Sequence, residues 1–266
     1  MGDSEVRPKN HGGPSPPAPE RGVEALRSSA AKGLQVKDSR TSKNRSNKAW
    51  IRRHLDDPYV QAANREGYRS RAAYKLIEID DRDRLIRAPA TVVELGAAPG
   101  SWTQVLVQRL ADRAGQVRGR VIAVDLLPIE PIAGVQAIEG DFREESVERS
   151  LVEALQGRPA DLIVSDMSPN LTGIDAADAA RSQDLCELTL QFAVNHLRPG
   201  GDLLVKAFQA SGFSQFVEQL KKRFKTVAVR KPAASRPESS EVYLLARGLK
   251  SEQDPAGFAA KRGRST

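Results

Sequence analysis

Charged residues stand at the carboxyl ends of several apolar runs in the middle of the chain. Three of them are acids, Asp125, Asp141 and Asp166, and the fourth is Lys206. A single charge there is an ordinary strand end, but four at the same end of successive strands are hard to explain as structure alone. Open α/β sheets bind ligands at this end, and an acid after the second strand is placed to hold ribose hydroxyls. The pattern predicts a binding site there, beside a lysine that can act as a base if its pKa is lowered.

The stretch Thr91–Trp102, TVVELGAAPGSW, predicts the corner around which the rest of the chain is organised. Val92–Leu95 is typical of a short buried strand, Gly96–Gly100 is a turn of small residues, and an apolar helical pattern begins at Ser101. Such a corner brings a ligand close to the backbone and offers it free N–H groups. The Gly-x-x-x-Gly spacing departs from the Gly-x-Gly-x-x-Gly of dinucleotide binders and suits a nucleoside without a phosphate, such as S-adenosylmethionine. A tight βα turn without a ligand is the alternative.

The hydrophobic pattern predicts an α/β domain that positions these residues. Seven strands are expected at 92–95, 120–126, 136–140, 161–167, 202–208, 226–230 and 241–246. Helices are expected at 71–79, from 101 onward, and at 179–196 and 212–224, whereas 59–69 looks turn-like. Crossover helices between most strands indicate a parallel sheet that ends in an antiparallel pair.

Composition narrows the class of protein. The net charge of +7 and the isoelectric point near 9.6 favour a polyanionic partner, nucleic acid first and an anionic membrane surface second. The single cysteine, Cys186, excludes an internal disulfide framework and a cysteine-based zinc site, and the three histidines show no metal spacing. Because no apolar run is long enough to span a bilayer and no signal peptide is visible, we expect a cytoplasmic protein without a membrane partner.

The charge is concentrated near the N-terminus. Between Ala31 and Arg53 there are eight Lys or Arg and one acid, an excess equal to the net charge of the whole chain. We expect residues 1–45 to form a disordered basic tail, 46–248 the folded domain and 249–266 a flexible basic tail. Such a basic run contacts RNA phosphates without reading sequence, or is simply solvated. Trp50 within it stacks on a base or anchors the tail to the domain.

Several motifs, in order, resemble the FtsJ/RrmJ (RlmE) family of ribosomal RNA ribose 2′-O-methyltransferases. The motifs are SRAAYKL (70–76), ELGAAPGSW (94–102), VDLLPIEPI (124–132), GDFREE (140–145), SDMSPNLTG (165–173), VKAFQ (205–209) and RKPAASRPESSEVYLLA (230–246). The resemblance covers essentially all of Tyr68–Arg247, and the first 45 residues match nothing in the family pattern. Ser101 stands where many relatives have a second glycine, which a helix start tolerates because serine can cap it.

The resemblance implies a fold, a cofactor and a set of site residues. The fold is the Rossmann-like methyltransferase fold, with a seven-stranded mostly parallel sheet, one antiparallel strand and helices on both faces. The implied cofactor is S-adenosyl-L-methionine, with contacts at Gly100, Trp102, Asp125, Asp141 and Asp166. The implied catalytic set is Lys75, Asp166, Lys206 and Glu241. No metal is implied.

The resemblance also implies a substrate. This is a uridine in the peptidyl-transferase region of 23S rRNA, within an assembled or nearly assembled 50S subunit, for an enzyme that we expect to be a monomer. Alternatives are a tRNA or cap ribose methyltransferase, a non-catalytic RNA-binding assembly factor and a nicotinamide dehydrogenase. Residues 165–170, SDMSPN, lack the paired prolines and the aromatic residue of base-amine methyltransferases, which disfavours methylation of a base.

The chemistry of such a reaction fits these residue types. A ribose 2′-hydroxyl is a poor nucleophile, so an enzyme must align it with the methyl carbon and remove its proton late in the displacement. Our hypothesis is that Lys206 is the base, that Lys75 and Asp166 position it, and that Glu241 orients a lysine or the ribose. A neighbouring lysine and partial burial lower the pKa of a lysine, whereas carboxylates raise it. In the alternative, Lys206 only steers the hydroxyl and water takes the proton.

Overall fold

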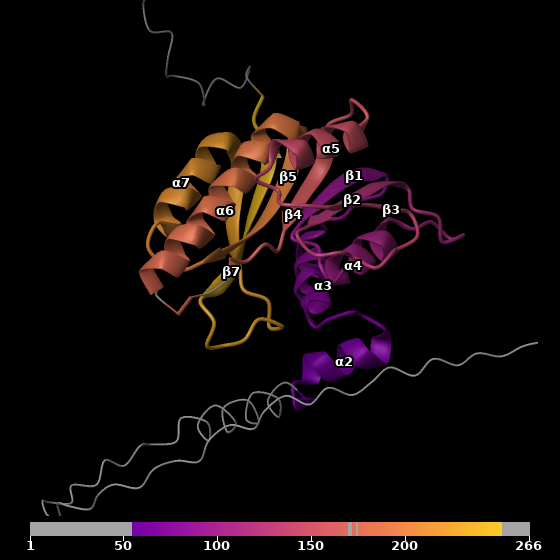
Figure 1. Ribbon diagram of the computed structural model, residues 1–266, viewed down its shortest axis with the longest axis horizontal. Helices are drawn as coiled ribbons and strands as arrows, with labels where there is room; N and C mark the ends of the chain where they lie inside the picture. The colour runs from indigo at the N-terminus through magenta and orange to yellow at the C-terminus, as the bar shows by residue number, and fades with distance from the viewer. Residues whose placement is uncertain (1–54, 170–171, 174, 252–266) are drawn as a thin grey trace, which may run out of the picture. The chain divides into compact units, whose positions relative to one another are not determined.

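The computed structural model of the chain describes residues 55–169, 172–173 and 175–251 (Figure 1). The predicted N-terminal tail, Trp50 and the C-terminal tail beyond residue 251 lie outside the described residues. Among the helices that are described, none is both long enough and apolar enough to cross a membrane.

A seven-stranded sheet in the order β3-β2-β1-β4-β5-β7-β6 forms the centre of the domain. Its strands are β1 (Ala90–Leu95), β2 (Gly119–Asp125), β3 (Val135–Glu139), β4 (Ala160–Ser165), β5 (Leu197–Phe208), β6 (Phe224–Arg230) and β7 (Glu241–Leu249). Strands β1 to β5 pair in parallel, and β7 runs antiparallel to both of its neighbours, β5 and β6. The prediction of a mostly parallel sheet with one antiparallel strand is confirmed.

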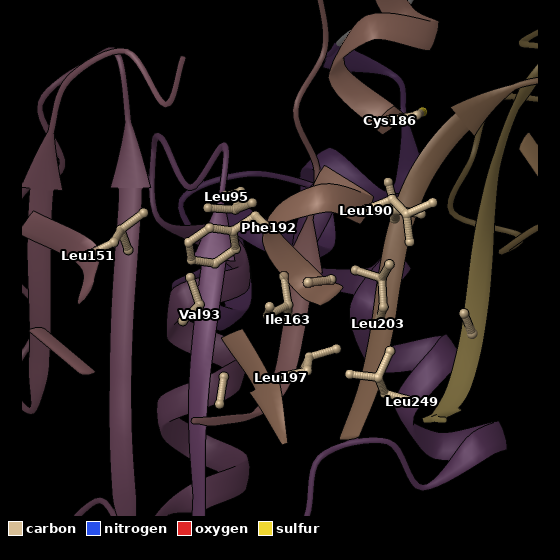
Figure 2. Packing of buried hydrophobic residues seen from close by; sticks show 14 of the residues in the cluster. Val93, Leu95, Leu151, Ile163, Cys186, Leu190, Phe192, Leu197, Leu203 and Leu249 are labelled. Carbon is tan, nitrogen blue, oxygen red and sulfur yellow. The ribbon is translucent and has the colours of Figure 1, made fainter. Parts of the chain in front are cut away.

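Helices cover both faces of this sheet, as predicted. They are α2 (Pro58–Glu66), α3 (Ala72–Asp83), α4 (Ser101–Leu110), α5 (Glu145–Leu155), α6 (Asp175–His196) and α7 (Phe213–Arg223). Residues of α5, α6 and α7 pack in one buried cluster with the side chains of one sheet face, whereas residues of α3 and α4 pack in a second cluster with the other face. Figure 2 shows the first cluster, in which Phe192 lies beside Leu95 and Val93, and Leu190 lies beside Leu203.

The turn-like prediction for 59–69 is wrong, because helix α2 occupies most of it. Proline at its first position fits a helix start, and the Asp57 carboxylate accepts a hydrogen bond of 3.0 Å from the Tyr59 N–H. The helix ends at Gly67, whose φ of 78° lies in the left-handed region. These start and stop signals are present in the sequence, but the polar face of a short helix resembles a loop.

Other boundaries differ from the prediction by a few residues. Strand β5 begins at Leu197, five residues before the expected start at 202, and its pairing with β4 shifts register between Ala160 and Leu162. This irregularity accommodates the Pro-Gly-Gly sequence inside a strand. Cys186 is buried in the first cluster, and burial raises the pKa of its thiol to about 12.

Candidate active site

The glycine turn between β1 and α4 is a tight passage for the backbone. Gly96 and Gly100 have φ values of 77° and 104°, which side chains rarely adopt. A Cβ at position 96 would lie 2.7 Å from the backbone nitrogen of Met167, so the turn packs directly against the chain that follows β4. Helix α4 begins at Ser101 immediately after the turn, as the sequence predicted.

Asp125, at the end of β2, ties the glycine turn to the next loop. Its Oδ2 accepts a hydrogen bond of 2.8 Å from the Ala98 N–H, and its Oδ1 accepts one of 2.9 Å from the Leu127 N–H. A carboxylate oxygen has two lone pairs, so both oxygens retain capacity for a ligand hydroxyl. The carboxylate is therefore held in place by the backbone while it stays available at the edge of the sheet.

Asp141 follows β3 and lies next to this loop, because the Gly140 N–H donates to the Asp125 carbonyl at 2.9 Å. The Arg143 guanidinium lies 2.5 Å from Asp141 Oδ2, and the Arg143 N–H donates to Oδ1 at 3.0 Å. The hydrogen bond from the guanidinium, and to a smaller extent the one from the backbone N–H, hold the pKa of the Asp141 carboxyl below its usual value. The structure thus brings Asp141 to the predicted edge, with its carboxylate engaged by its own loop.

Trp102 has its side chain in the core. The indole is 2% exposed, and its Nε1–H donates to the Ala72 carbonyl at 2.8 Å. Its ring centroid lies 5.5 Å from that of Tyr243. The side chain of Trp102 therefore packs α4 against α3 and β7. Only the backbone of Trp102, in the first turn of α4, is left for a contact with a ligand.

Glu94 is a buried carboxyl beneath the glycine turn, and our sequence reasoning did not select it. The residue is 1% exposed, and its Oε2 accepts a hydrogen bond of 2.6 Å from the Thr103 hydroxyl. Burial raises the pKa of Glu94 to about 8, helped by the negative charges of Asp166 and Asp125 and opposed by the Thr103 hydrogen bond. An acid inside an otherwise apolar strand was the signal that could have found it.

The first of two lysine–carboxylate pairs joins β5 to the end of β4. The amine of Lys206, a residue only 8% exposed, donates to the Asp166 carbonyl at 2.7 Å and lies 3.2 Å from Asp166 Oδ1. The Tyr243 hydroxyl donates to the same Oδ1 at 2.7 Å. Lys206 and Tyr243 are direct partners in the register of β5 and β7, which places both side chains on one face of the sheet.

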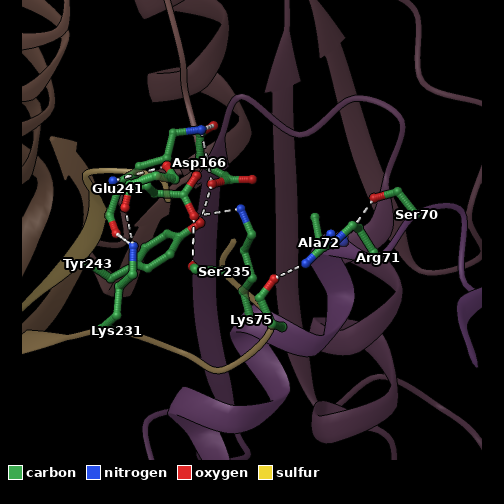
Figure 3. A network of polar contacts seen from close by, with 12 residues as sticks. Ser70, Arg71, Ala72, Lys75, Asp166, Lys231, Ser235, Glu241 and Tyr243 are labelled. Carbon is green, nitrogen blue, oxygen red and sulfur yellow. Dashed lines mark hydrogen bonds and ion pairs between the residues drawn. The ribbon is translucent and has the colours of Figure 1, made fainter. Parts of the chain in front are cut away.

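The second pair joins α3 to the start of β7. Lys75 Nζ donates to Glu241 Oε1 at 2.7 Å, and Glu241 is 9% exposed (Figure 3). Burial alone would raise the pKa of Glu241, but the positive charge and hydrogen bond of Lys75, with smaller help from Lys206 and Ser235, lower it below its usual value. The Glu241 carboxylate is therefore held in its ionised form.

Tyr243 connects the two pairs, and sequence reasoning missed it. Its ring centroid lies 5.8 Å from Lys75 Nζ, and its hydroxyl contacts Asp166. Burial, together with the charges of Asp166 and Glu241, raises the pKa of Tyr243 well above its usual value, so the phenol remains a donor. Its position two residues after Glu241 on one strand, and so on the same face, was the available signal.

The four predicted catalytic residues thus lie in one network at the carboxyl edge of the parallel strands, and Figure 3 shows Lys75, Asp166 and Glu241 within it. Because β7 runs antiparallel, its first residue, Glu241, reaches this edge too. Two lysine amines, two carboxylates and a phenol can orient a hydroxyl and move its proton. No group of histidine, cysteine or acidic residues that could hold a metal ion occurs in the described part of the chain.

Comparison with known proteins gives a consistent family. The family model of the FtsJ-like methyltransferases matches residues 68–249. The ribosomal RNA large subunit methyltransferase E of Bordetella petrii is 57% identical over 210 residues, which cover 79% of this chain and all of that protein. The protein of the same name from Burkholderia mallei is 56% identical over 216 residues, covering 79% of this chain and 98% of that protein.

A solved structure agrees with this result. The crystal structure of a ribosomal RNA methyltransferase from Plasmodium falciparum is similar to this chain, with a TM-score of 0.62 and 29% sequence identity. The similarity covers 68% of this chain and 98% of that one. The family match spans both lysine–carboxylate pairs and the glycine turn, and the chain belongs to the FtsJ-like methyltransferase family.

Proposed function

We propose that this protein transfers a methyl group from S-adenosylmethionine to the 2′-oxygen of a ribose in ribosomal RNA of the large subunit. The observation that carries the proposal is the buried network of Lys75, Glu241, Tyr243, Asp166 and Lys206, set beside the glycine turn. Methyl transfer to a hydroxyl needs an oriented hydroxyl and a proton acceptor, and this network supplies both. Relatives named for methylation of large-subunit ribosomal RNA support the substrate class.

The site residues fit the cofactor by shape and by charge. S-adenosylmethionine carries a sulfonium and an ammonium group, and the edge of the sheet holds the carboxylates of Asp125 and Asp166, whose negative charges also raise the pKa of the buried Glu94. A Cβ at Gly96 would collide with the Met167 backbone and one at Gly100 with the Arg69 guanidinium, so glycine at these positions keeps the turn tight beside the proposed cofactor site. In this proposal the cofactor is bound by Gly100, the backbone of Trp102, Asp125, Asp141 and Asp166. When bound, the cofactor supplies a methyl group already activated on sulfur.

Lys206 is our choice for the proton acceptor. An amine has three positions for hydrogen-bond partners, and two of those of Lys206 point to the carbonyl and Oδ1 of Asp166. The third is left for the 2′-hydroxyl, and the neutral amine takes its proton as the new oxygen–carbon bond forms. Asp166 fixes the direction of the amine. In the alternative mechanism, Lys206 only orients the hydroxyl and water accepts the proton.

Lys75 and Glu241 orient the ribose in this proposal. The Glu241 carboxylate is ionised and holds the Lys75 amine through one oxygen, Oε1. The remaining lone pairs of the carboxylate and the remaining N–H groups of the amine are suited to the hydroxyls of a ribose. The pair thereby positions the hydroxyl that Lys206 deprotonates.

The finer assignments follow the family and the charge of the chain. We propose a uridine of 23S rRNA within the 50S subunit as the substrate, a monomeric cytoplasmic enzyme, and an N-terminal tail at 1–45 outside the domain. The expected end of the domain at residue 248 moves by at least one residue, because Leu249 is the last residue of β7. The excess of basic residues between Ala31 and Arg53 supports an RNA partner. A tRNA or cap ribose methyltransferase shares the mechanism and differs only in substrate, and a non-catalytic assembly factor would bind RNA without using the network.

The test is methyl transfer from labelled S-adenosylmethionine to purified 50S subunits, free 23S rRNA and bulk tRNA. The Lys206→Met variant removes the amine and keeps most of the side-chain volume. Lys222→Met, at an exposed position on α7, is the matched control. Label recovered in a dinucleotide after alkaline hydrolysis identifies a ribose 2′-O-methyl group, because the phosphodiester bond next to a methylated 2′-oxygen is not cleaved by alkali.

The expected result is label on 50S subunits that Lys206→Met loses and Lys222→Met keeps. Label on tRNA alone would replace the substrate and keep the mechanism. Near-normal turnover by Lys206→Met would exclude Lys206 both as the base and as the group that steers the hydroxyl. Cofactor binding without transfer to any RNA would instead favour the assembly factor.

A further inference from the structure

The loop between β6 and β7, residues 231–240, is fastened to helix α3. The Glu78 carboxylate accepts hydrogen bonds from the N–H groups of Ala233 and Ala234, at 2.6 and 3.0 Å. The Arg71 guanidinium donates to the Ala234 carbonyl on the same stretch. Ala234 is fully buried, so this part of the loop is built into the domain, unlike an ordinary surface connection.

Ser235 follows in this fixed stretch and points toward the network, as Figure 3 shows. The residue is 4% exposed, and its hydroxyl donates to Glu241 Oε1 at 2.9 Å. The same oxygen accepts the Lys75 amine at 2.7 Å. One carboxylate oxygen thus receives two donors, one from α3 and one from the loop that α3 holds.

The arrangement has a common origin on α3. Lys75 and Glu78 are three residues apart, so they lie on the same side of the helix. The first supplies the amine that pairs with Glu241, and the second holds the backbone immediately before Ser235. Helix α3 therefore sets the positions of both donors relative to each other.

We propose that Ser235 is a positioning residue that fixes the Glu241 carboxylate against Lys75, an inference that rests on the proposed function for its effect on turnover. With a single donor, the carboxylate can rotate about its last side-chain bond and still keep Lys75. With two donors on one oxygen, the second oxygen has one direction, which is the one presented to substrate. A hydroxyl that donates to a carboxylate also stabilises its ionised form.

The first measurement is a titration of the Glu241 side-chain carboxyl by ¹³C NMR on the full chain, assigned with Glu241→Gln. We compare wild type, Ser235→Ala, Ser235→Thr and Ser240→Ala. Ser240 is the matched control, because it lies in the same loop, is exposed, and makes no side-chain hydrogen bond within the described residues. If Ser235→Ala does not fold, as judged by circular dichroism, Ser235→Cys takes its place, because a thiol keeps the volume and is a weak donor.

The expected result is a Glu241 titration midpoint raised by about one pH unit in Ser235→Ala, since a hydrogen bond to a charged group is worth roughly tenfold in its ionisation equilibrium. Ser235→Thr restores the wild-type midpoint, Ser235→Cys gives a smaller rise, and Ser240→Ala leaves the midpoint unchanged. An unchanged midpoint in Ser235→Ala, or in Ser235→Cys if that variant is used, would overturn the inference.

The second measurement is the steady-state kinetics of methyl transfer at neutral pH. We expect kcat lower by about tenfold in Ser235→Ala, KM for RNA within about twofold of wild type, and recovery of kcat in Ser235→Thr. Equal losses of kcat in Ser235→Ala and Ser235→Thr would indicate a merely structural role. If wild type transfers no methyl group, the proposed function fails, and the NMR titration still decides whether Ser235 positions Glu241.

Discussion

Replacing Glu94 by glutamine is expected to stabilise the protein relative to wild type, by an amount that grows as pH rises. Glu94 is 1% exposed and has the Thr103 hydroxyl as its hydrogen-bond donor. Its pKa, raised from 4.5 to about 8 by burial and by the charges of Asp166 and Asp125, keeps the carboxyl protonated in the folded protein at neutral pH. Glutamine has nearly the same shape and can still accept the hydrogen bond from Thr103, but it has no proton to lose.

The magnitude follows from the difference between the folded and unfolded pKa values. Between pH 4.5 and 8 the unfolded chain ionises Glu94 while the folded protein keeps it neutral. Each pH unit in this window therefore lowers the free energy of unfolding of wild type by about 1.4 kcal/mol. From pH 5 to pH 7.5 the variant should gain about 3 kcal/mol relative to wild type. Below pH 4.5 and above pH 8 the difference is constant, since both states then carry the same number of protons.

The assay is urea unfolding at pH 5, 6, 7 and 8 without cofactor, followed by tryptophan fluorescence. Glu153→Gln, which removes an exposed carboxylate from α5, is the matched control. A difference in the free energy of unfolding between Glu94→Gln and wild type that is the same at every pH would report the new amide alone. The test is therefore how this difference changes with pH. If that difference is the same at pH 5 and pH 8, Glu94 is ionised in the folded protein and the reasoning is refuted.

Three further predictions follow from the fold and the charge of the chain. Gly96→Ala, whose Cβ would lie 2.7 Å from the Met167 backbone, should lose roughly 1–3 kcal/mol more stability in thermal unfolding than Gly115→Ala, which has a similar φ and open space; equal losses would contradict the steric argument. Asp83→Asn should cost roughly 2 kcal/mol at pH 7, because Arg230 donates two hydrogen bonds of 2.7 Å to this carboxylate and, with smaller help from Arg247, lowers its pKa. This contribution is present above the ordinary Asp pKa of 3.8 and is lost as pH falls through the lowered folded value, so the cost should vanish in acid unfolding curves; a cost that persists there would exclude the charge as its source. Deleting residues 1–45 should weaken RNA binding and flatten its dependence on salt in filter-binding measurements, and an unchanged slope would mean that the tail makes no phosphate contacts.

Much of the fold could be predicted, because short stretches of the sequence encode most of its strands and helices. All seven strands and most helices follow from hydrophobic patterns that a short window contains, and the glycine turn marks the ligand edge. Asp125, Asp141, Asp166 and Lys206 could be selected as strand-end charges for the same reason. Helix α2 was missed, since nine mostly polar residues carry little hydrophobic pattern and its caps are the clearer signal.

The partnerships within the site are encoded at long range. Lys75 and Glu241 are 166 residues apart, and no local pattern tells that β7 inserts between β5 and β6. The family resemblance supplied these two residues, which the composition and spacing did not. Tyr243 and Ser235 were overlooked because a tyrosine in a strand and a serine in a polar loop are ordinary in those places. Their roles become visible only when the contacts with Asp166 and Glu241 are known.

The position of β7 also has a consequence for synthesis. Within the sheet, β6 pairs with no strand except β7, and β7 covers the edge of β5. A chain emerging from the ribosome can therefore build β1 to β5 early, but it exposes the open edge of β5 until the last strand arrives. The same strand delivers Glu241 and Tyr243, so a chain that stops short of β7 is both prone to aggregate and unable to complete its site. Solubility and assembly of the lysine–carboxylate network thus both depend on the addition of β7, which requires that synthesis has reached the end of that strand.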